Sequence, residues 1–389
     1  MRTTRQLLAP IALALAAFMA AIEPSTGAVQ APPATPAPSP AQKLADLRAR
    51  AESGDAAAQL SLGLVYAIGQ GVPRDYAQAA AWYRRSAEQG KALAQLNLGW
   101  CYDAGLGVPQ DFTQAAAWYR KAAEQGEPTA QVKLGGLYAT GAGVPQDEAA
   151  AAAWYRKAAD QGDAGAQLKL GLALLNGRGV GRDEVQAVAL FWKAADKGKA
   201  QAQFMLGVML ENGRGVPQNL PDAARWYRRA AEQDDVTAQL NLGACYELGR
   251  GVPQDYAQAL AWYRRAADHG EARAQANLGH AYANGRGVAQ DHTQAAAWYR
   301  RAADQGHASS QYALGELYAG ALGVQRSDVE ACRWFLIAES CAASSGDRAA
   351  YTSARERVAR RMTAAQVDEA QRLARAWLDD FSRRAKRPR

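Results

Sequence analysis

Residues 92–126 read ALAQLNLGWCYDAGLGVPQDFTQAAAWYRKAAEQG, and this pattern recurs along most of the chain. Its Leu-Gly pair returns at intervals of 36 residues, which gives eight copies with no insertion or deletion. The pairs are Leu62-Gly63, Leu98-Gly99, Leu134-Gly135, Leu170-Gly171, Leu206-Gly207, Leu242-Gly243, Leu278-Gly279 and Leu314-Gly315. A fixed period that leaves room for only two helices per copy is typical of a stacked repeat array.

The copies share the pattern A-x-A-Q-x-x-L-G-x-x-Y-x-x-G-x-G-V-x-x-D-x-x-x-A-x-x-W-Y-x-x-A-A-x-x-G. It resembles the Sel-one-like repeat family, a branch of the tetratricopeptide-like superfamily, over roughly residues 39–341. The resemblance implies an all-α fold, a right-handed superhelical α-solenoid of eight helix-turn-helix repeats with capping helices. Such solenoids are usually binding scaffolds whose ligand depends on a few surface residues, so the pattern is more specific for fold than for function.

Capping residues mark the second helix of each copy. It begins after Asp, Asn or Ser, residue types that accept a hydrogen bond from an unpaired first-turn amide. These residues are Asp75, Asp111, Asp147, Asp183, Asn219, Asp255, Asp291 and Ser327. Gln, Asp or Glu follows three residues later in every copy except the third, which has Ala150, and is able to complete a capping box. We therefore expect these carboxylates to be caps and not catalytic acids.

The second helix carries Trp at one position in seven copies, and Tyr83 and its equivalents follow directly. This shared register predicts core packing and not a cofactor site. The G-x-G-V turns between the helices lack the preceding strand and the Lys-Ser/Thr pair of a phosphate-binding loop. No cofactor is expected.

Residues 1–28 have the pattern of a secretory signal peptide, with Arg2 and Arg5 before an apolar run and small residues at 26–28. An uncleaved anchor is the alternative, but the run is shorter than the roughly 20 residues that a spanning helix needs. Export to the periplasm or the medium is therefore expected, with no transmembrane span after cleavage. Residues 29–38 are rich in Pro and Ala and predict an extended tether.

Both ends of the array should be capped. Residues 39–54 are in register with the second half of a repeat, and Ser39, Pro40 and Gln42 form a helix start with a capping box. The eight repeats then occupy residues 55–341. Residues 342–382 should form C-terminal capping helices at 347–361 and 363–381, after a last repeat helix that runs on to Gly346. Residues 383–389 form a basic tail.

The chain has a formal net charge of +7. Basic pairs such as Arg84-Arg85 recur on the second helices, each followed by an acid at i+3 or i+4. This spacing predicts a solvated, partly neutralised face, so we expect no nucleic acid partner. An acidic protein or peptide partner fits the charge better, and a monomer is favoured.

The four cysteines are expected to be free, buried thiols. Cys101 and Cys245 share one position in copies four repeats apart, and Cys332 and Cys341 would lie on roughly opposite faces of one helix, where a bridge is left open. This departs from the cysteine-rich branch of the family, which is often labelled as β-lactamase.

The chain also has no S-x-x-K serine, no metal-ligand cluster and no paired base, and its four His are scattered. We therefore predict no catalytic residues, no metal site and no enzyme activity. A cell-envelope enzyme acting on peptidoglycan or a β-lactam remains an alternative, as does a secreted factor that engages host proteins.

Comparison of the copies shows where the repeat leaves the residue free. On the first helix the most varied positions are those of Ala57, Ser61, Leu64 and Ile68, whose spacing places them on one helical face. In this superfamily the first helices line the concave side, so these positions predict a groove that binds an extended peptide or partner segment. The candidate groove residues are Asn97, Trp100, Lys133, Lys169, Asn176, Met205, Asn212, Asn241, Asn277, His280 and Asn284.

Three features of this face suggest how it binds. Trp100 is expected to be an anchor outside the repeat core. Lys133 and Lys169 share a register in successive repeats and are expected to bracket a carboxylate or acidic stretch. The asparagines are expected to pair with peptide backbone. A merely solvated face and binding on the convex basic face remain alternatives.

Overall fold

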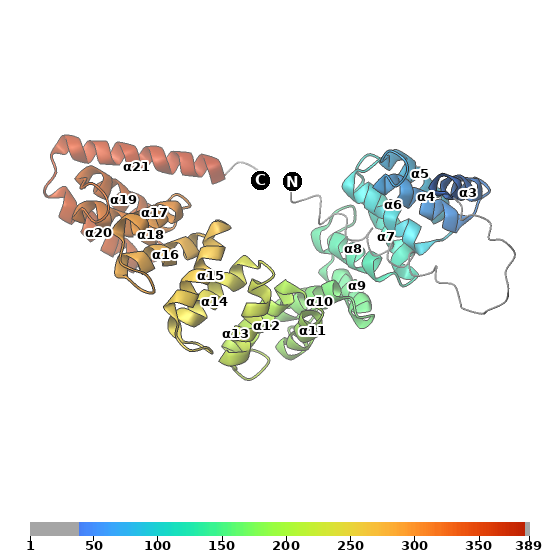
Figure 1. Cartoon of the computed structure of the whole chain (residues 1–389), viewed down its shortest axis with the longest axis horizontal. Helices are drawn as coiled ribbons and strands as arrows, with labels where there is room; N and C mark the ends of the chain where they lie inside the picture. Colours follow the sequence, from blue (N-terminus) through green and yellow to red (C-terminus); the bar gives the residue numbers. More distant parts are fainter. Residues whose placement is uncertain (1–38, 386–389) are drawn as a thin grey trace. The chain divides into compact units, whose positions relative to one another are not determined.

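The computed structural model describes residues 39–385, and every regular element in this range is an α-helix (Figure 1). The first helices of the eight repeats are α4 Ala56–Ile68, α6 Ala92–Ala104, α8 Pro128–Thr140, α10 Ala164–Asn176, α12 Ala200–Asn212, α14 Val236–Leu248, α16 Ala272–Asn284 and α18 Ala308–Gly320. The second helices are α5 Tyr76–Glu88, α7 Phe112–Glu124, α9 Glu148–Asp160, α11 Glu184–Asp196, α13 Leu220–Ala231, α15 Tyr256–Asp268, α17 His292–Ala303 and α19 Asp328–Cys341. The predicted all-α solenoid of eight helix-turn-helix repeats is confirmed.

The chain divides into two compact units, residues 1–182 and 183–389. Among the described residues, the first unit holds α3 to α10 and the second holds α11 to α21. Consecutive helices pack side by side within each unit up to α20, and α21 packs against α19. The division lies inside the fourth repeat, whose turn carries Gly181 where five other copies carry proline. The predicted signal peptide and tether lie outside the described residues.

Each second helix begins at the N-cap residue that the sequence predicts. In α7, one Asp111 carboxylate oxygen accepts from the backbone amides of Thr113 and Gln114 at 2.9 and 3.0 Å. The expected capping boxes do not form here, because the amide of Asp111 itself donates to the Tyr102 carbonyl of the first helix at 3.0 Å. The same bond recurs at Asp75, Asp147, Asn219, Asp255, Asp291 and Ser327, so no N-cap amide is left for the Gln side chain in these helices.

The core of each repeat consists of its Leu-Gly pair and a Tyr of the second helix, which is Phe191 in the fourth repeat and Phe335 in the eighth. Leu98 and Tyr119 are fully buried. A Cβ added to Gly99 would lie 2.7 Å from the Tyr119 ring, so only glycine allows the two helices to approach this closely. The Trp beside each Tyr is less buried than predicted: Trp226, Trp298 and Trp334 are buried, whereas the other four of the register are half-buried.

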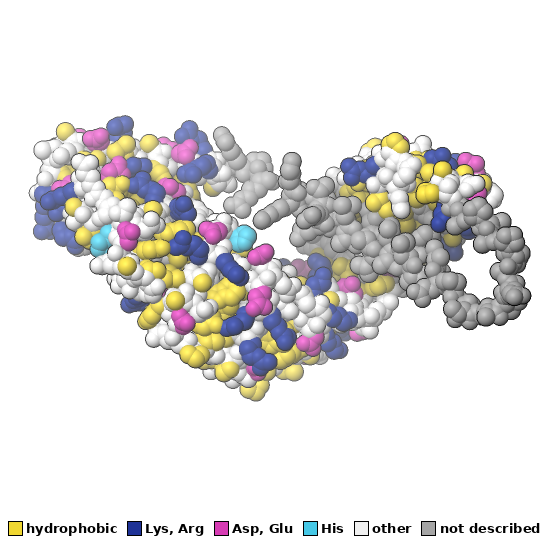
Figure 2. All heavy atoms as spheres, in the orientation of Figure 1, with side chains coloured by type: hydrophobic (Ala, Val, Ile, Leu, Met, Phe, Trp, Pro, Cys, Tyr) yellow, Lys and Arg dark blue, Asp and Glu magenta, His cyan; other side chains and the backbone are white. Residues whose placement is uncertain are grey.

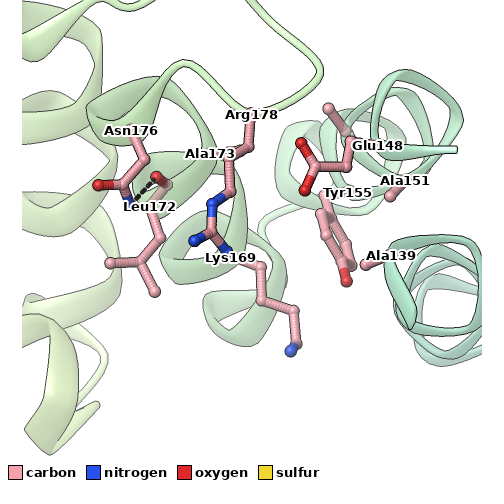
Figure 3. Close-up of a pocket in the computed structure, with 10 residues that line it drawn as sticks. Ala139, Glu148, Ala151, Tyr155, Lys169, Leu172, Ala173, Asn176 and Arg178 are labelled. Carbon is pink, nitrogen blue, oxygen red and sulfur yellow. Dashed lines mark hydrogen bonds between the residues drawn. The ribbon is translucent and has the colours of Figure 1, made fainter. Parts of the chain in front are cut away.

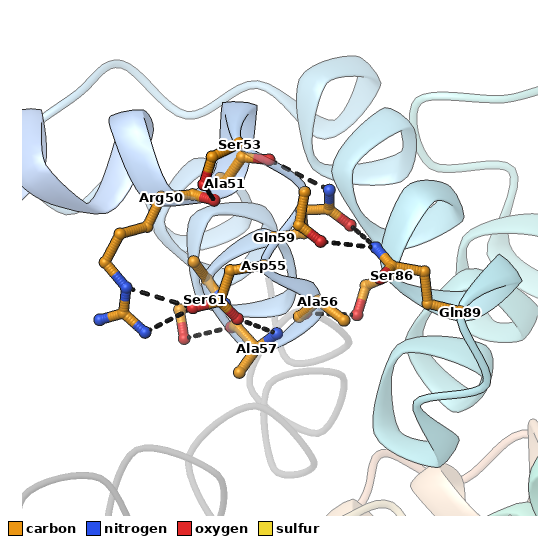
Figure 4. Close-up of polar contacts among 12 residues, drawn as sticks. Arg50, Ala51, Ser53, Asp55, Ala56, Ala57, Gln59, Ser61, Ser86 and Gln89 are labelled. Carbon is orange, nitrogen blue, oxygen red and sulfur yellow. Dashed lines mark hydrogen bonds and ion pairs between the residues drawn. The ribbon is translucent and has the colours of Figure 1, made fainter.

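A row of buried glutamines, called here the glutamine ladder, links the helices of successive repeats. These glutamines follow the second alanine of the repeat pattern, and sequence analysis assigned them no role. In Figure 4, Gln59 Nε2 donates to the Ala51 carbonyl at 3.0 Å, and Gln59 Oε1 accepts from Gln89 Nε2 at 2.8 Å. Eight such glutamines donate to the carbonyl eight residues earlier, at 3.0 to 3.3 Å. They are Gln59, Gln95, Gln131, Gln167, Gln203, Gln239, Gln275 and Gln311.

Helix α3, Pro40–Glu52, precedes the repeats, and its Ser39–Gln42 capping box has both of its bonds. Helix α19 ends at Cys341 and does not run on to Gly346, because Ala342 is extended and Ser344 caps the next helix. That helix is α20, Ser345–Ala359, and α21, Ala364–Ala385, follows. Helix α21 therefore includes Arg383 and Arg384, which the sequence placed in the basic tail.

The last helix covers the end of the array. Trp377 of α21 makes an edge contact with Trp334 of α19 at 6.1 Å between ring centroids and stacks on Phe381 at 4.9 Å. Helix α20 is joined to the last repeat by an ion pair of 2.6 Å between Arg357 and Glu316. None of the described helices combines the length and apolar character that a membrane span requires.

Candidate functional site

The predicted groove residues all lie on first helices. In the first unit these are Asn97 and Trp100 on α6, Lys133 on α8, and Lys169 and Asn176 on α10; in the second they are Met205 and Asn212 on α12, Asn241 on α14, and Asn277, His280 and Asn284 on α16. Lys169, Asn176, Asn212, His280 and Asn284 are exposed, and the other six are half-buried. A groove that is continuous through both units stays a prediction.

Trp100 is part of the packing between repeats. Its side chain packs against the buried clusters on both sides of α6, and its ring makes an edge contact with Tyr76 at 6.5 Å. The expectation that Trp100 lies outside the repeat core is therefore wrong. A half-buried indole still leaves an exposed edge for a partner, but its removal will also weaken the array.

The asparagines form two rows with different partners. Asn176, Asn212 and Asn284 end their helices and donate to the carbonyl four residues earlier at 2.8 to 2.9 Å, which leaves one amide hydrogen and the side-chain carbonyl for a ligand. Asn241 and Asn277 instead interact with the side chains of Tyr227 and Tyr263. The asparagines of the first row are exposed, whereas Asn241 and Asn277 are half-buried.

Lys133 already has a carboxylate partner within the chain. Its Nζ lies 3.6 Å from Asp103 Oδ2, and the same oxygen accepts from the Tyr119 hydroxyl at 3.0 Å. Burial, followed by the Asp103 charge, raises the pKa of Tyr119. Glu211 and Glu247 accept in the same way from Tyr227 and Tyr263, each at 2.6 Å. Sequence reasoning missed these acids, although each precedes its tyrosine by 16 residues.

A cavity of about 280 Å³ opens between α9 and α10 and is called here the α9–α10 pocket (Figure 3). Lys169 and Asn176, two of the predicted residues, line it. Tyr155, Glu148 and Arg178 also line it, and sequence analysis singled out none of them for binding. The remaining lining residues are Ala139, Ala151, Ala152, Leu172 and Ala173.

The basic pairs of the second helices are held by aromatic rings. Arg264 Nη2 donates to the Tyr282 hydroxyl of the next repeat at 2.7 Å, and the Arg265 guanidinium lies 4.6 Å from the Trp262 ring centroid. The predicted neutralisation of such pairs by acids at i+3 or i+4 does not occur as ion pairs among the described residues of these repeats. Figure 2 shows Lys and Arg side chains interspersed with Asp and Glu over the surface of the second unit. The charges of the second helices thus also contact the next repeat, as Arg264 does.

The four thiols are free, as expected. Burial raises the pKa of Cys101 to about 12 and that of Cys245 to about 11, which is the opposite of the shift that activates a nucleophile. Within residues 39–385 no group of three or more His, Cys, Asp or Glu side chains is placed to hold a metal ion.

A profile of the Sel1 repeat matches eight consecutive segments, residues 56–91, 92–127, 128–163, 164–199, 200–235, 236–271, 272–307 and 308–341. A solved Sel1 repeat protein from Oxalobacter formigenes is 38% identical, with a TM-score of 0.61, over 80% of this chain and 90% of its own. A protective antigen present in uropathogenic Escherichia coli strains, which displays an SLR fold, is 32% identical, with a TM-score of 0.55, over 88% of this chain and 96% of its own. No curated protein sequence matches the chain.

Proposed function

Because this chain belongs to the Sel1 repeat family, whose members are generally protein-interaction scaffolds, we propose that it is an exported, non-enzymatic scaffold. Its ligand is an extended peptide or a segment of a partner protein, bound on the exposed face of the first helices. The α9–α10 pocket carries the proposal, since it opens where the variation among copies predicts binding and is lined by Lys169 and Asn176.

The two helices of a repeat differ in how their polar side chains are engaged, and this difference supports the choice of the first-helix face. On the second helices, Tyr119 is buried and Arg264 and Arg265 are engaged with aromatic rings, so these residues serve the array. On the first helices, Lys169 and His280 are exposed and form no ion pair with a described residue. A partner therefore meets unused polar groups on the first-helix face.

Export rests on residues 1–28, whose basic start, apolar run and small residues match a secretory signal. Fractionation of cells into cytoplasm, periplasm and medium, with detection of the chain in each fraction, tests it. Recovery only from the cytoplasm would contradict export. Nitrocefin turnover by the purified protein tests the enzymatic alternative, and a scaffold without an activated nucleophile should show none.

Site-specific photo-crosslinking tests the binding face. A photoreactive amino acid at Asn212, exposed on α12, should give a discrete adduct with a partner from envelope extract, and an excess of unlabelled protein should compete it away. The matched control is the same amino acid at Glu232, which is exposed at the end of α13 in the same repeat. Adducts from Glu232 but not from Asn212 would mean that the partner binds on the side of the second helices.

A further inference from the structure

Three repeats contain a triad that joins their two helices to the next repeat. An acid near the end of the first helix accepts from the tyrosine hydroxyl of the second helix, as Asp103 does from Tyr119. A cation of the following repeat faces the same acid: Lys133 lies 3.6 Å from Asp103, Arg250 3.8 Å from Glu211 and Arg286 3.9 Å from Glu247. In each triad one carboxylate therefore serves a hydroxyl and a cation.

The third repeat keeps the donors of this triad and lacks the acid. Ala139 stands in the register of Asp103, whereas Tyr155 is in the register of Tyr119. Both kinds of cation are present, since Lys169 is in the register of Lys133 and Arg178 is in the register of Arg250. Among the described residues, neither cation has an ion-pair partner and the Tyr155 hydroxyl has no acceptor. Lys169 Nζ lies 5.6 Å from the Tyr155 ring centroid.

The α9–α10 pocket lies where the missing carboxylate would be. Figure 3 shows the Tyr155 hydroxyl beside Ala139, with the Lys169 side chain extending from α10 on the same side. A second small residue lies near the Tyr155 hydroxyl: a Cβ added to Gly136 would lie 4.0 Å from its oxygen, and other copies have Trp100, Leu172 or Glu316 in this register. Since a water molecule takes up about 30 Å³, about 280 Å³ is ample for a carboxylate and its methylene groups.

We propose that the α9–α10 pocket binds one carboxylate of the partner segment, which takes the place that Asp103 fills in the second repeat. The Tyr155 hydroxyl, Lys169 Nζ and the Arg178 guanidinium donate to it, while Leu172 and the alanines of the wall contact its methylene groups. This inference rests on the proposed scaffold function and names the chemistry of its ligand. The source of the carboxylate is an acidic side chain or the carboxyl terminus of the partner.

The remaining charge in the pocket limits what binds. Glu148 also lines it, at the first turn of α9, where the helix amides favour a negative charge. Lys169 and Arg178 against Glu148 give a net lining charge of +2 − 1 = +1. One carboxylate neutralises this charge, and anions of higher charge meet repulsion from Glu148. Burial raises the pKa of Tyr155, so its hydroxyl remains a donor at neutral pH.

The first experiment needs no ligand. In the full chain, Ala139→Asp supplies the missing carboxylate, and Ala139→Asn supplies a side chain of the same shape without charge. Ala139→Asp should melt about 2–4 °C above Ala139→Asn at pH 7. The paired carboxylate has a lowered pKa, so this advantage should be present above about pH 4 and be lost as the pH falls further. Equal melting temperatures at pH 7 would overturn the site.

The second experiment measures binding by ¹⁹F NMR with three labelled octapeptides of one neutral glycine–serine sequence. The first has a free C-terminal carboxylate, the second a C-terminal amide, and the third the amide and one central glutamate. At least one acidic peptide should bind wild-type protein about tenfold more tightly than the neutral amide, because a charge-assisted hydrogen bond is typically worth that factor. Whichever acidic peptide binds identifies the source.

Variants show whether the pocket is responsible. Ala139→Asp should remove the preference for the acidic peptide by occupying the pocket, and Lys169→Met should weaken binding about tenfold. The matched control is Lys91→Met, at an exposed lysine of the same unit that makes no side-chain capping bond. Equal binding of all three peptides, no detectable binding, or an unchanged preference in Ala139→Asp would each overturn the proposal. In those cases crosslinking from Asn212 would still report separately on the scaffold function.

Discussion

Gln95 joins three helices through one side chain. Its Nε2 donates to the Ala87 carbonyl at 3.1 Å and its Oε1 accepts from Gln125 at 2.7 Å. Gln95→Leu removes both bonds, one of them to the carbonyl of buried Ala87, so the free energy of unfolding should fall by about 1–3 kcal/mol in urea denaturation followed by circular dichroism. Gln114→Leu, at an exposed glutamine of α7, is the control and should change it by less than about 0.5 kcal/mol. Equal effects of the two changes would show that the ladder adds no stability.

The thiols give a prediction about pH. With a pKa of about 12 for Cys101 and about 11 for Cys245, both should be protonated and unreactive toward Ellman's reagent at pH 8 in the folded protein. Their reaction should speed up about tenfold per pH unit below those values, because only the thiolate reacts. All four thiols should react at once in denaturant. Rapid labelling of Cys101 at pH 7, identified by its loss in Cys101→Ala, would contradict this burial.

Residue types predicted helix caps well, but they did not predict which side chains contact one another across helices. Asp111 was recognisable as a cap because its partners lie two and three residues away. The partner of Gln95 at Gln125 lies 30 residues away on the other side of the same repeat, and the partner of Arg264 lies 18 residues away in the next repeat. In a periodic sequence, equivalent candidate partners recur in every repeat. Which of them a side chain contacts depends on how the helices stack, and the sequence alone does not give this.

Helix boundaries depend on backbone conformation that single residues adopt. Ala321 has φ 55°, in the left-handed region, at the position where the first helices of the other repeats are followed by glycine. Alanine pays about 1 kcal/mol of strain there, so Ala321→Gly should raise the free energy of unfolding by about that amount in urea denaturation.

The control for this change is Ala319→Gly, inside α18, which should lower the free energy of unfolding by about 1 kcal/mol. The opposite signs distinguish relief of backbone strain from a general effect of glycine. A loss of stability in Ala321→Gly would show that the alanine is not strained in the folded protein.

At the level of elements, the repeats were predicted closely and the ends less so. Inside the array each helix-start signal occurs in all eight copies, so the copies together define the helix boundaries. Beyond Cys341 the period stops, and Ser344 caps a new helix three residues later, whereas the sequence analysis expected the last repeat helix to run on to Gly346. The end of α21 also lies outside the period, so no second copy marks it. The helix extends through Arg384, whose Nε pairs with Asp380 at 3.0 Å.

For the whole molecule, periodicity predicts which internal deletions are tolerated. Deletion of residues 92–127 removes one full repeat and joins Lys91 to Pro128 in register, so Gln131 meets the Ala87 carbonyl in place of Ala123. Helicity per residue and cooperative unfolding should be retained by circular dichroism. Deletion of residues 92–125 is the control; it shifts the register by two residues and should give a less helical protein that melts lower. Similar melting of both would mean that register does not matter.

The fold could be read from the period because eight equal copies admit few other structures. The proposed binding face was inferred from variation among copies, and the pocket on it includes Lys169 and Asn176. The pocket itself could not be foreseen from those residues, because it lies where Ala139 replaces the acid of other repeats. Only the structure shows that Tyr155, Lys169 and Arg178 line the same space as Ala139.

Ala139 also has a meaning in the genetic code. An alanine codon becomes an aspartate or a glutamate codon through a change of its second base alone, and the reverse change restores alanine. One point mutation therefore converts a repeat that satisfies its own tyrosine, as the second does with Asp103, into one that must accept its acid from another molecule. The number and placing of receptor sites along such an array can thus change over generations while the backbone and its helices stay as they are.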